Sequence, residues 1–85
     1  MLRKRRRKKI ELILYNDDYN SFTSVINGLK NYLPECSVLR AEQIAQIVHS
    51  KGKCSIYKGF GTEAFMIQSQ LIKRGLLVES KVYKK

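Results

Sequence analysis

The fold is decided by residues 10–22, which read IELILYNDDYNSF. Residues 10–15 are mostly aliphatic or aromatic, as in a β-strand, and the Asn16-Asp17-Asp18 run that follows is typical of a turn. Ser21 or Asn20 then offers an N-cap for a helix that begins at Phe22. The stretch therefore predicts a strand, a polar loop and a helix in direct succession.

Two helices are expected in the first half of the chain. From Phe22 to Leu33 the apolar residues recur at the spacing of one helix face, and Pro34 ends that helix. A second helix is predicted after Ser37 as its N-cap, and it should end near residue 51 with Gly52 in the left-handed conformation. The apolar face of the second helix consists of Ala41, Ile44, Ala45 and Val48.

A strand, a third helix and a last strand complete the predicted order. Residues 53–58 alternate loosely between apolar and polar, and Gly59-Phe60-Gly61 is expected to close this strand as a turn. Thr62 is the predicted N-cap of the third helix, which ends before Gly75, and residues 76–83 predict a terminal strand. In the third helix, Ala64, Phe65, Gln68, Leu71 and Ile72 recur at helical spacing. The order βααβαβ predicts a single α+β domain, in which a three-stranded antiparallel sheet packs against three helices.

The size and composition of the chain exclude large catalytic folds. At 85 residues it has room for one domain with one modest core, and none for an enclosed active chamber. With 44% hydrophobic and 28% charged residues, it has the composition of an ordinary globular domain. The sequence offers neither a nucleophile–base pair nor a set of metal ligands, so we expect a protein that is not an enzyme and that holds no metal or cofactor.

Most of the positive charge lies in one run. The chain has 17 Lys and Arg residues against 7 Asp and Glu, a formal net charge of +10, and residues 3–9 are all Arg or Lys. We therefore divide the chain into a basic tail, 1–9, and a domain, 10–85, whose own balance is only mildly positive. The tail is interpreted either as a solubilising segment or as an electrostatic arm for nucleic acid, an anionic membrane surface or an acidic protein.

The sequence also bears on location and on cysteine chemistry. No apolar run approaches the length of a membrane span, and no apolar signal core follows the basic residues, so we expect a cytoplasmic protein without a membrane partner. Cys36 and Cys54 are too few and too far apart for a disulfide framework or a zinc site. Both are interpreted as small core or surface residues.

Two polar features lie where a ligand could bind. Asn16, Asp17 and Asp18 either form Asx-turns that cap the coming helix or present their oxygens to a cation. His49, the only histidine, either meets the negative pole of its helix or takes part in a binding site. Taken separately, each feature is compatible with both interpretations.

Considered together, these motifs are similar to those of a known family. Tyr15-Asn16-Asp17-Asp18-Tyr19-Asn20-Ser21-Phe22 closes the first strand, Val48-His49 precedes a Gly52-Lys53 turn, and Gly75-Leu76-Leu77 opens the last strand. This combination resembles the ClpS family, the adaptors that recognise protein N-termini and deliver them to the Clp AAA+ protease. The resemblance covers about residues 10–79, and ClpS domains have the βααβαβ order predicted above.

The resemblance implies that Asn16, Asp17 and His49 bind the α-amino group of a substrate. A free N-terminus is an ammonium group with three donors, so a site that prefers it must present several acceptors. Asp17 would add a complementary charge, Asn16 a neutral carbonyl oxygen, and a neutral His49 one ring nitrogen. An acetylated N-terminus would lose the charge and leave acceptors unpaired.

The resemblance also implies an apolar pocket for the first side chain of the substrate. Its rim would be Asp18 and Asn20, and its deeper walls would be Phe22, Val25, Ala45 and Leu76. Each wall residue also lies on the apolar face of its own element, where it could simply pack in the core. The implied substrates are N-degron peptides with a bulky hydrophobic first residue, namely Leu, Phe, Tyr or Trp. ClpS proteins usually have methionine at positions 22 and 45 and threonine at position 20.

The implied partner is the N-terminal domain of a Clp AAA+ chaperone of the ClpA or ClpC type. The chain itself is expected to be a monomer. The chaperone-docking stretch of the family is represented here only by Thr62-Glu63-Ala64, so Glu63 is the one docking residue carried over. The alternative function is a small basic protein that binds nucleic acid or the ribosome through its Arg and Lys tail. The mildly charged domain and its acidic motif favour the adaptor over this alternative. Nucleic acid is then expected to contact the protein only non-specifically, through the tail.

Overall fold

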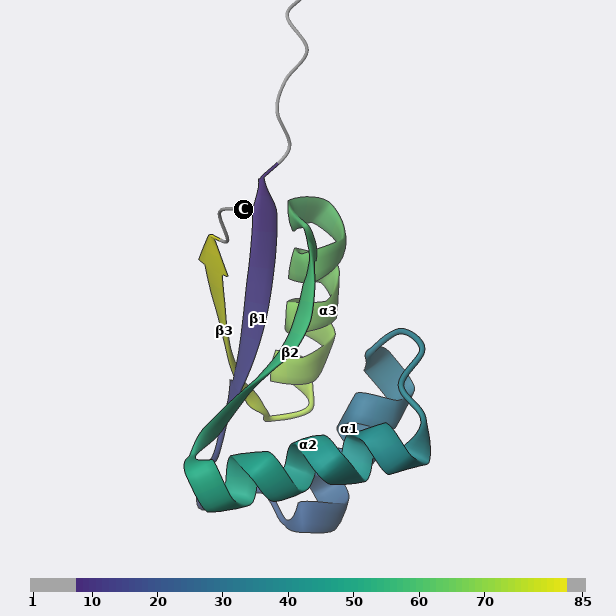
Figure 1. The fold of residues 1–85 in the computed structure, drawn as a ribbon, viewed down its shortest axis with the longest axis vertical. Coiled ribbons are helices and arrows are strands. Elements are labelled where there is room, and N and C mark those ends of the chain that lie inside the picture. Colours follow the sequence, from purple (N-terminus) through teal and green to yellow (C-terminus); the bar gives the residue numbers. More distant parts are fainter. Residues whose placement is uncertain (1–7, 83–85) are drawn as a thin grey trace, which may run out of the picture.

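The computed structural model describes residues 8–82, which form three helices and three strands (Figure 1). In chain order these are β1 (Lys9–Tyr15), α1 (Phe22–Tyr32), α2 (Val38–Lys51), β2 (Lys53–Phe60), α3 (Gly61–Lys73) and β3 (Leu77–Val82). The predicted βααβαβ order and the α+β class are confirmed. Residues 1–7 of the basic tail and Tyr83, the last residue of the expected terminal strand, lie outside the described residues.

β1 is the central strand of an antiparallel sheet with the order β2-β1-β3. Its last residue, Tyr15, lies opposite Lys53 of β2 and Leu77 of β3, and at the other end Lys9 lies opposite Phe60. The β1–β2 register shifts between residues 12 and 13, which marks a β-bulge. Figure 1 shows α3 alongside the sheet and α1 and α2 at the end where β1 finishes. The polar loop after Tyr15 therefore lies where the sheet meets α1 and α2.

The core lies between the sheet and the helices. Ile10, Leu12 and Leu14 point inward from β1, because side chains alternate along a strand, and none of them is more than 4% exposed. The other buried members of the core are Leu29, Leu33, Ala41, Ile44, Val48, Ile56, Ala64, Ile67, Leu71, Leu76 and Val78. At about 25 cal/mol per Å² of apolar surface removed from water, this cluster is the main stabilising contribution to the fold.

Three predicted helix ends are confirmed. The Ser21 hydroxyl accepts from the backbone N–H of Ser24 at 3.1 Å, and the Ser37 hydroxyl accepts from that of Arg40 at 3.1 Å. Gly52 ends α2 with φ 93°, a left-handed conformation that glycine adopts without steric cost. These ends determine where the β1–α1 loop meets α1 and where α2 turns into β2.

Two predictions about the junction of β2 and α3 are wrong. β2 continues through Gly59 and Phe60, which pair with β1 instead of forming a turn, and α3 begins at Gly61. Thr62 therefore lies inside the helix, whose N-cap is Phe60 and has no side-chain hydrogen bond. Pairing with a strand that is distant in sequence extends β2, and this non-local contribution outweighs the local turn preference of the two glycines.

The buried face of α3 also differs from the expected one. Phe65 and Ile72 are 52% and 50% exposed, whereas Ile67 is 5% exposed. α3 has apolar residues on several sides, so more than one face fits the spacing of a helix. Contact with the sheet selects the face that contains Ala64, Ile67 and Leu71.

Candidate functional site

The loop between β1 and α1 is organised around the carboxylate of Asp17. Its Oδ1 accepts from the backbone N–H groups of Tyr19 and Asn20 at 2.8 and 2.9 Å, which closes an Asx-turn. The Nδ2 of Asn20 also donates to the carboxylate, at 3.1 Å to Oδ1 and 3.0 Å to Oδ2. Among the described residues Oδ2 has this one donor, so it can accept a further hydrogen bond.

The same hydrogen bonds set the charge of Asp17. Desolvation by itself would raise the pKa of this carboxyl group. The hydrogen bonds from the Asn20 side chain and from the backbone of Tyr19 and Asn20 outweigh it, and they lower the pKa below the ordinary value for aspartate. Asp17 is therefore ionised at neutral pH and gives the loop a full negative charge.

Asn20 joins this loop to the turn before β3. Its Nδ2 donates to the Gly75 carbonyl oxygen at 2.8 Å, and its Oδ1 accepts from the Ser24 hydroxyl at 3.2 Å. Gly75 has φ 92°, which a residue with a Cβ rarely adopts. Asn20 thus connects three segments, namely the loop, the first turn of α1 and the turn between α3 and β3.

The end of α2 lies beside the start of the loop. The backbone N–H of Asn16 donates to the Gly52 carbonyl oxygen at 2.9 Å, directly after α2. His49 lies in the last turn of α2 and has an exposed side chain. The left-handed Gly52 therefore does more than end the helix, because its carbonyl group also brings Asn16 close to the turn that contains His49.

A recess formed by the loop, α1 and α2 brings most of the expected binding residues together. Its lining consists of Asn16, Asn20, Ser21, Phe22, Val25, Ala45, Val48 and His49. The polar groups of Asn16 and His49 thus lie beside an apolar wall from Phe22, Val25 and Ala45. The volume of the recess is about 20 Å³, which is room for about one water molecule.

Three expected residues do not line this recess. The Asp17 carboxylate takes part in the turn described above, and the Asp18 side chain is exposed. Leu76 is 4% exposed and belongs to the core. A Cβ added to Gly28 of α1 would lie 2.9 Å from Cδ1 of Leu76, so the absence of a side chain at Gly28 permits this close contact.

Two residues that line the recess, Ser21 and Val48, were not predicted from the sequence to belong to a binding site. Val48 follows Ala45 by three positions on the buried face of α2, so the spacing of a helix could have pointed to it. Ser21 was recognised only as the N-cap of α1, and its place in the recess follows from its position directly before Phe22.

Glu63, the expected docking residue, lies in the first turn of α3 and not among the residues that line the recess. Burial, a hydrogen bond to Glu63 and the negative charge of Glu63 together raise the pKa of the Tyr57 hydroxyl. The Glu63 carboxylate is therefore engaged with β2 and lies at a surface separate from the recess.

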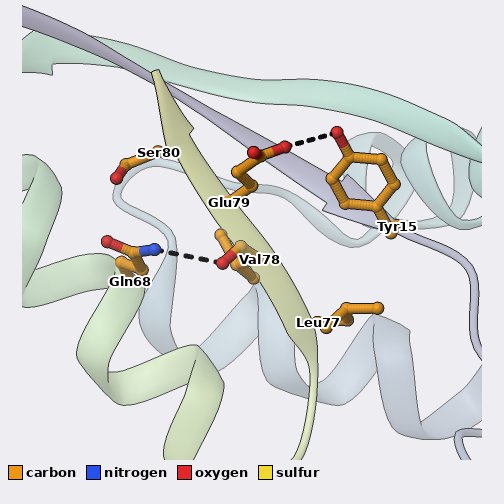
Figure 2. Close-up of a pocket in the computed structure, with 6 residues that line it drawn as sticks. All are labelled: Tyr15, Gln68, Leu77, Val78, Glu79 and Ser80. Carbon is orange, nitrogen blue, oxygen red and sulfur yellow. Dashed lines mark hydrogen bonds between the residues drawn. The ribbon is translucent and has the colours of Figure 1, made fainter. Parts of the chain in front are cut away.

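A much larger hollow, of about 550 Å³, lies along β3 (Figure 2). In it the Tyr15 hydroxyl donates to Glu79 Oε1 at 2.6 Å, and this hydrogen bond is the main reason why the pKa of Tyr15 is raised. The Nε2 of Gln68 donates to the Val78 carbonyl oxygen at 3.0 Å. β3 is an edge strand, so Gln68 satisfies a backbone group that the edge would otherwise expose. Two hydrogen bonds thus join polar groups of this hollow to each other, and the expected binding residues lie elsewhere.

The described part of the chain has neither a metal-binding cluster nor a helix that could span a membrane. Between residues 8 and 82, no three side chains of His, Cys, Asp or Glu come together as metal ligands could. In the same range, no helix combines the length and the apolar character that crossing a bilayer requires. Cys36 and Cys54 are free and partly buried, and burial raises the pKa of both thiols.

The chain is similar to proteins of one known family. A family model described as "ATP-dependent Clp protease adaptor protein ClpS" matches residues 5–77. The ATP-dependent Clp protease adapter protein ClpS of Thermosynechococcus vestitus is 32% identical over 66 residues, which cover 78% of this chain and 70% of that protein. The ClpS of a Synechocystis species is also 32% identical over 66 residues, with 78% and 67% covered. Among solved structures, Agrobacterium tumefaciens ClpS2 bound to L-phenylalaninamide has a TM-score of 0.84 at 19% identity, with 92% of this chain and 100% of that chain covered.

Proposed function

Since this chain belongs to the ClpS family of ATP-dependent Clp protease adaptors, we propose that it binds the free N-terminus of proteins with a bulky hydrophobic first residue and delivers them to a Clp AAA+ chaperone–protease. The observation that carries the proposal is the recess at the β1–α1 loop. There the acceptors of Asn16 and His49 lie beside the apolar side chains of Phe22 and Val25. Such a recess suits a ligand that has a charged group next to an apolar one.

The charged group in this proposal is the α-ammonium of the substrate. It has three donors, and Asn16 and a neutral His49 can each accept one of them. The third acceptor is the Oδ2 of Asp17, which receives one hydrogen bond from the Asn20 side chain. Because the lowered pKa of Asp17 keeps this carboxylate ionised, its hydrogen bond with the ammonium would be charge-assisted and stronger than a neutral one.

The apolar group in this proposal is the first side chain of the substrate, and the recess must widen to receive it. Its volume of about 20 Å³ is far below that of a leucine or phenylalanine side chain. Phe22 is 41% exposed in the first turn of α1, so its ring can move toward solvent without opening the core. We expect Phe22 to rotate outward as the substrate side chain enters, with Asp18 and Asn20 at the rim and Ala45 and Leu76 deeper.

The structural neighbour supports this choice of ligand. Agrobacterium tumefaciens ClpS2 was solved with L-phenylalaninamide, a molecule that has a free α-amino group and an aromatic side chain. These are the two groups that the proposal assigns to the recess. The order of preference among Leu, Phe, Tyr and Trp is expected to depend on the residues at positions 22 and 45, where this chain has Phe22 and Ala45.

The partner in this proposal is the N-terminal domain of a Clp AAA+ chaperone of the ClpA or ClpC type. The adaptor acts on it as a monomer in the cytoplasm, and it carries the substrate without catalysing a reaction. Glu63 is the docking residue that we propose, and its place outside the recess would let substrate and chaperone bind together. Glu63→Lys is therefore expected to weaken binding to the chaperone domain and to leave peptide affinity unchanged.

Peptide binding tests the proposal. Fluorescent peptides that begin with a free Leu or Phe are expected to bind the full chain, as measured by anisotropy. Their N-acetylated forms should bind at least about 100-fold more weakly, because acetylation removes the charge and leaves acceptors unpaired. Asp17→Asn is expected to lower the affinity for peptides with a free N-terminus at least about tenfold. Glu42→Gln makes an equal change of charge on the exposed face of α2, and it should leave this affinity unchanged. Equal binding of free and acetylated peptides would reject the proposal.

A further inference from the structure

Basic residues of the domain gather at the end of the sheet opposite the recess. β1 runs from Lys9 at this end to Tyr15 beside the recess, and its 7 residues span about 20 Å. β1 begins and β3 ends at the same end of the sheet (Figure 1). We call Lys8, Lys9, Lys58 and Lys81 the basic end. The Arg and Lys run at residues 3–7 leads directly into it.

The strand register places three members of the basic end, Lys9, Lys58 and Lys81, on the outer face of the sheet. Glu11 of β1 lies opposite Lys58 of β2 and opposite Lys81 of β3. Because Leu12 points into the core, Glu11 and its two cross-strand partners point away from it. Lys9, two positions before Glu11, shares this face. Glu79, two positions before Lys81 on β3, lies on the same face. Three lysines, Lys9, Lys58 and Lys81, thus stand with two carboxylates, and the face keeps a small positive balance.

An aromatic ring lies within the basic end. Phe60 is opposite Lys9 in the sheet, and it is 43% exposed. A ring on a sheet face among positive charges is the arrangement on which the bases of a single strand stack while lysines neutralise the phosphates. A double helix would fit less well, because its major groove admits a helix or a narrow ribbon and not the face of a sheet.

We propose that the basic end binds single-stranded nucleic acid. Phe60 would stack with a base and the lysines would contact phosphates, while the positive charges of residues 3–7 would add to the attraction for the phosphate backbone. All residues of that run except Lys4 are arginines. Guanidinium groups bind phosphate through two parallel hydrogen bonds and stack on bases, whereas attraction to a lipid surface or an acidic protein requires charge alone. The arginines and the aromatic ring therefore favour nucleic acid over these other polyanions.

This surface is independent of the peptide site. The two lie at opposite ends of β1, so one chain can hold a nucleic acid and an N-terminal peptide together. The proposal does not depend on the function proposed above, since each surface can fail in its own binding measurement while the other binds. If the peptide site and the basic end both bind their ligands, the protein would bind most tightly to substrates that are themselves attached to nucleic acid.

Anisotropy of a fluorescent oligouridylate of about 20 nucleotides tests the proposal with the full chain. We expect binding at low salt and a roughly 100-fold loss of affinity between about 50 and 200 mM salt, as for about five phosphate contacts. Phe60→Leu should weaken binding about tenfold while peptide affinity stays unchanged, because leucine keeps the apolar contact and loses the stacking face. A Phe60→Leu protein that binds RNA as the parent does would overturn the role of the ring.

Charge at the basic end is tested by a matched pair of double variants. Lys58→Gln with Lys81→Gln should weaken RNA binding about tenfold. Lys30→Gln with Lys73→Gln makes the same change of net charge on α1 and α3, and it should alter affinity less than about twofold. Thermal melts of both proteins verify that they are folded. Equal losses in the two double variants would overturn the proposal, because net charge and not this surface would then control binding.

Competing polyanions decide the class of partner. Phosphatidylserine vesicles and polyglutamate should bind the chain more weakly than the oligouridylate at equal charge concentration. Replacing Arg3, Arg5, Arg6 and Arg7 by lysine should weaken RNA binding several-fold and leave vesicle binding unchanged, since charge is conserved. Vesicle or polyglutamate binding equal to that of RNA, in the parent and in the lysine variant, would overturn the assignment to nucleic acid.

Discussion

The side-chain Nδ2 of Asn20 lies 2.8 Å from the Gly75 carbonyl oxygen, and it joins two segments that are 55 positions apart in sequence. The same nitrogen donates to both oxygens of Asp17. The position of the Asp17 carboxylate therefore depends on the turn between α3 and β3, although Gly75 itself does not line the recess.

Asn20→Ala is expected to lower the free energy of unfolding by about 1–3 kcal/mol, because Asp17 and the Gly75 carbonyl group both lose a donor. Peptide affinity should fall about tenfold, since the loop that presents Asp17 is released. Urea unfolding and peptide anisotropy measure the two effects. Asn31→Ala, at an exposed position of α1, is the control and should change neither. Unaltered affinity in Asn20→Ala would show that the loop does not need this connection.

Acid should remove the contribution of Asp17 to stability. The folded-state pKa of this group is lowered by hydrogen bonds, so its contribution is fully present above the unfolded value of about 3.9 and is lost as the pH falls through the lower folded-state value. The difference in unfolding free energy between the parent and Asp17→Asn should therefore be constant above about pH 5 and should shrink as the pH falls below about 4. A difference that stays constant down to about pH 2 would contradict this linkage.

Gly52→Ala should destabilise the protein by about 1 kcal/mol, because φ 93° is unfavourable for a residue with a Cβ even though no atom lies within 4 Å of the added group. Gly52→Asn should cost less, since asparagine tolerates the left-handed region. Thermal unfolding ranks the three proteins. Peptide binding should weaken in the same order, because the Gly52 carbonyl group holds the backbone of Asn16. An alanine variant as stable as the parent would be inconsistent with backbone strain.

Gln68→Ala should expose the edge of β3. The Val78 carbonyl group loses its donor, which costs about 1 kcal/mol of stability, and the unpaired edge becomes available to a second strand. We expect concentration-dependent self-association in analytical ultracentrifugation. Gln70→Ala, on the exposed side of the same helix, should leave the sedimentation unchanged. If both variants sediment as the parent does, then Gln68 does not protect the edge.

The fold could be predicted from the sequence where local signals act alone. Ser21, Ser37 and Gly52 mark helix ends through their own side chains or backbone conformation, and all three lie where expected. The end of β2 was not predictable in this way. Gly59 and Phe60 pair with the start of β1, almost fifty positions earlier, and that contact outweighs their local preference for a turn. The face of α3 was ambiguous because apolar residues surround the helix, and only packing against the sheet selects Ile67 over Phe65.

For the candidate site, the residue types were predictable and their hydrogen bonds were not. The structure brings Asn16 and His49 to one recess with Phe22, Val25 and Ala45, as the motifs indicate. The sequence offered two roles for the acidic loop, a turn or a set of acceptors, and in the structure the Asp17 carboxylate forms the turn. Its role as an acceptor for a ligand stays a prediction. The small volume of the recess depends on how rings and loops pack together, which no local pattern encodes.

The central position of β1 has a consequence for biosynthesis. Ile10 pairs with Val82, so β1 cannot complete its hydrogen bonds until nearly the whole described chain has been made. Contacts this distant in sequence form late, because the entropy of closing a long loop must be overcome first. Until then an aliphatic strand is exposed in the nascent chain, where it can aggregate with other strands. Lys9 begins that strand, and Lys8 and the basic run stand directly before it, in the place where charged gatekeeper residues suppress aggregation.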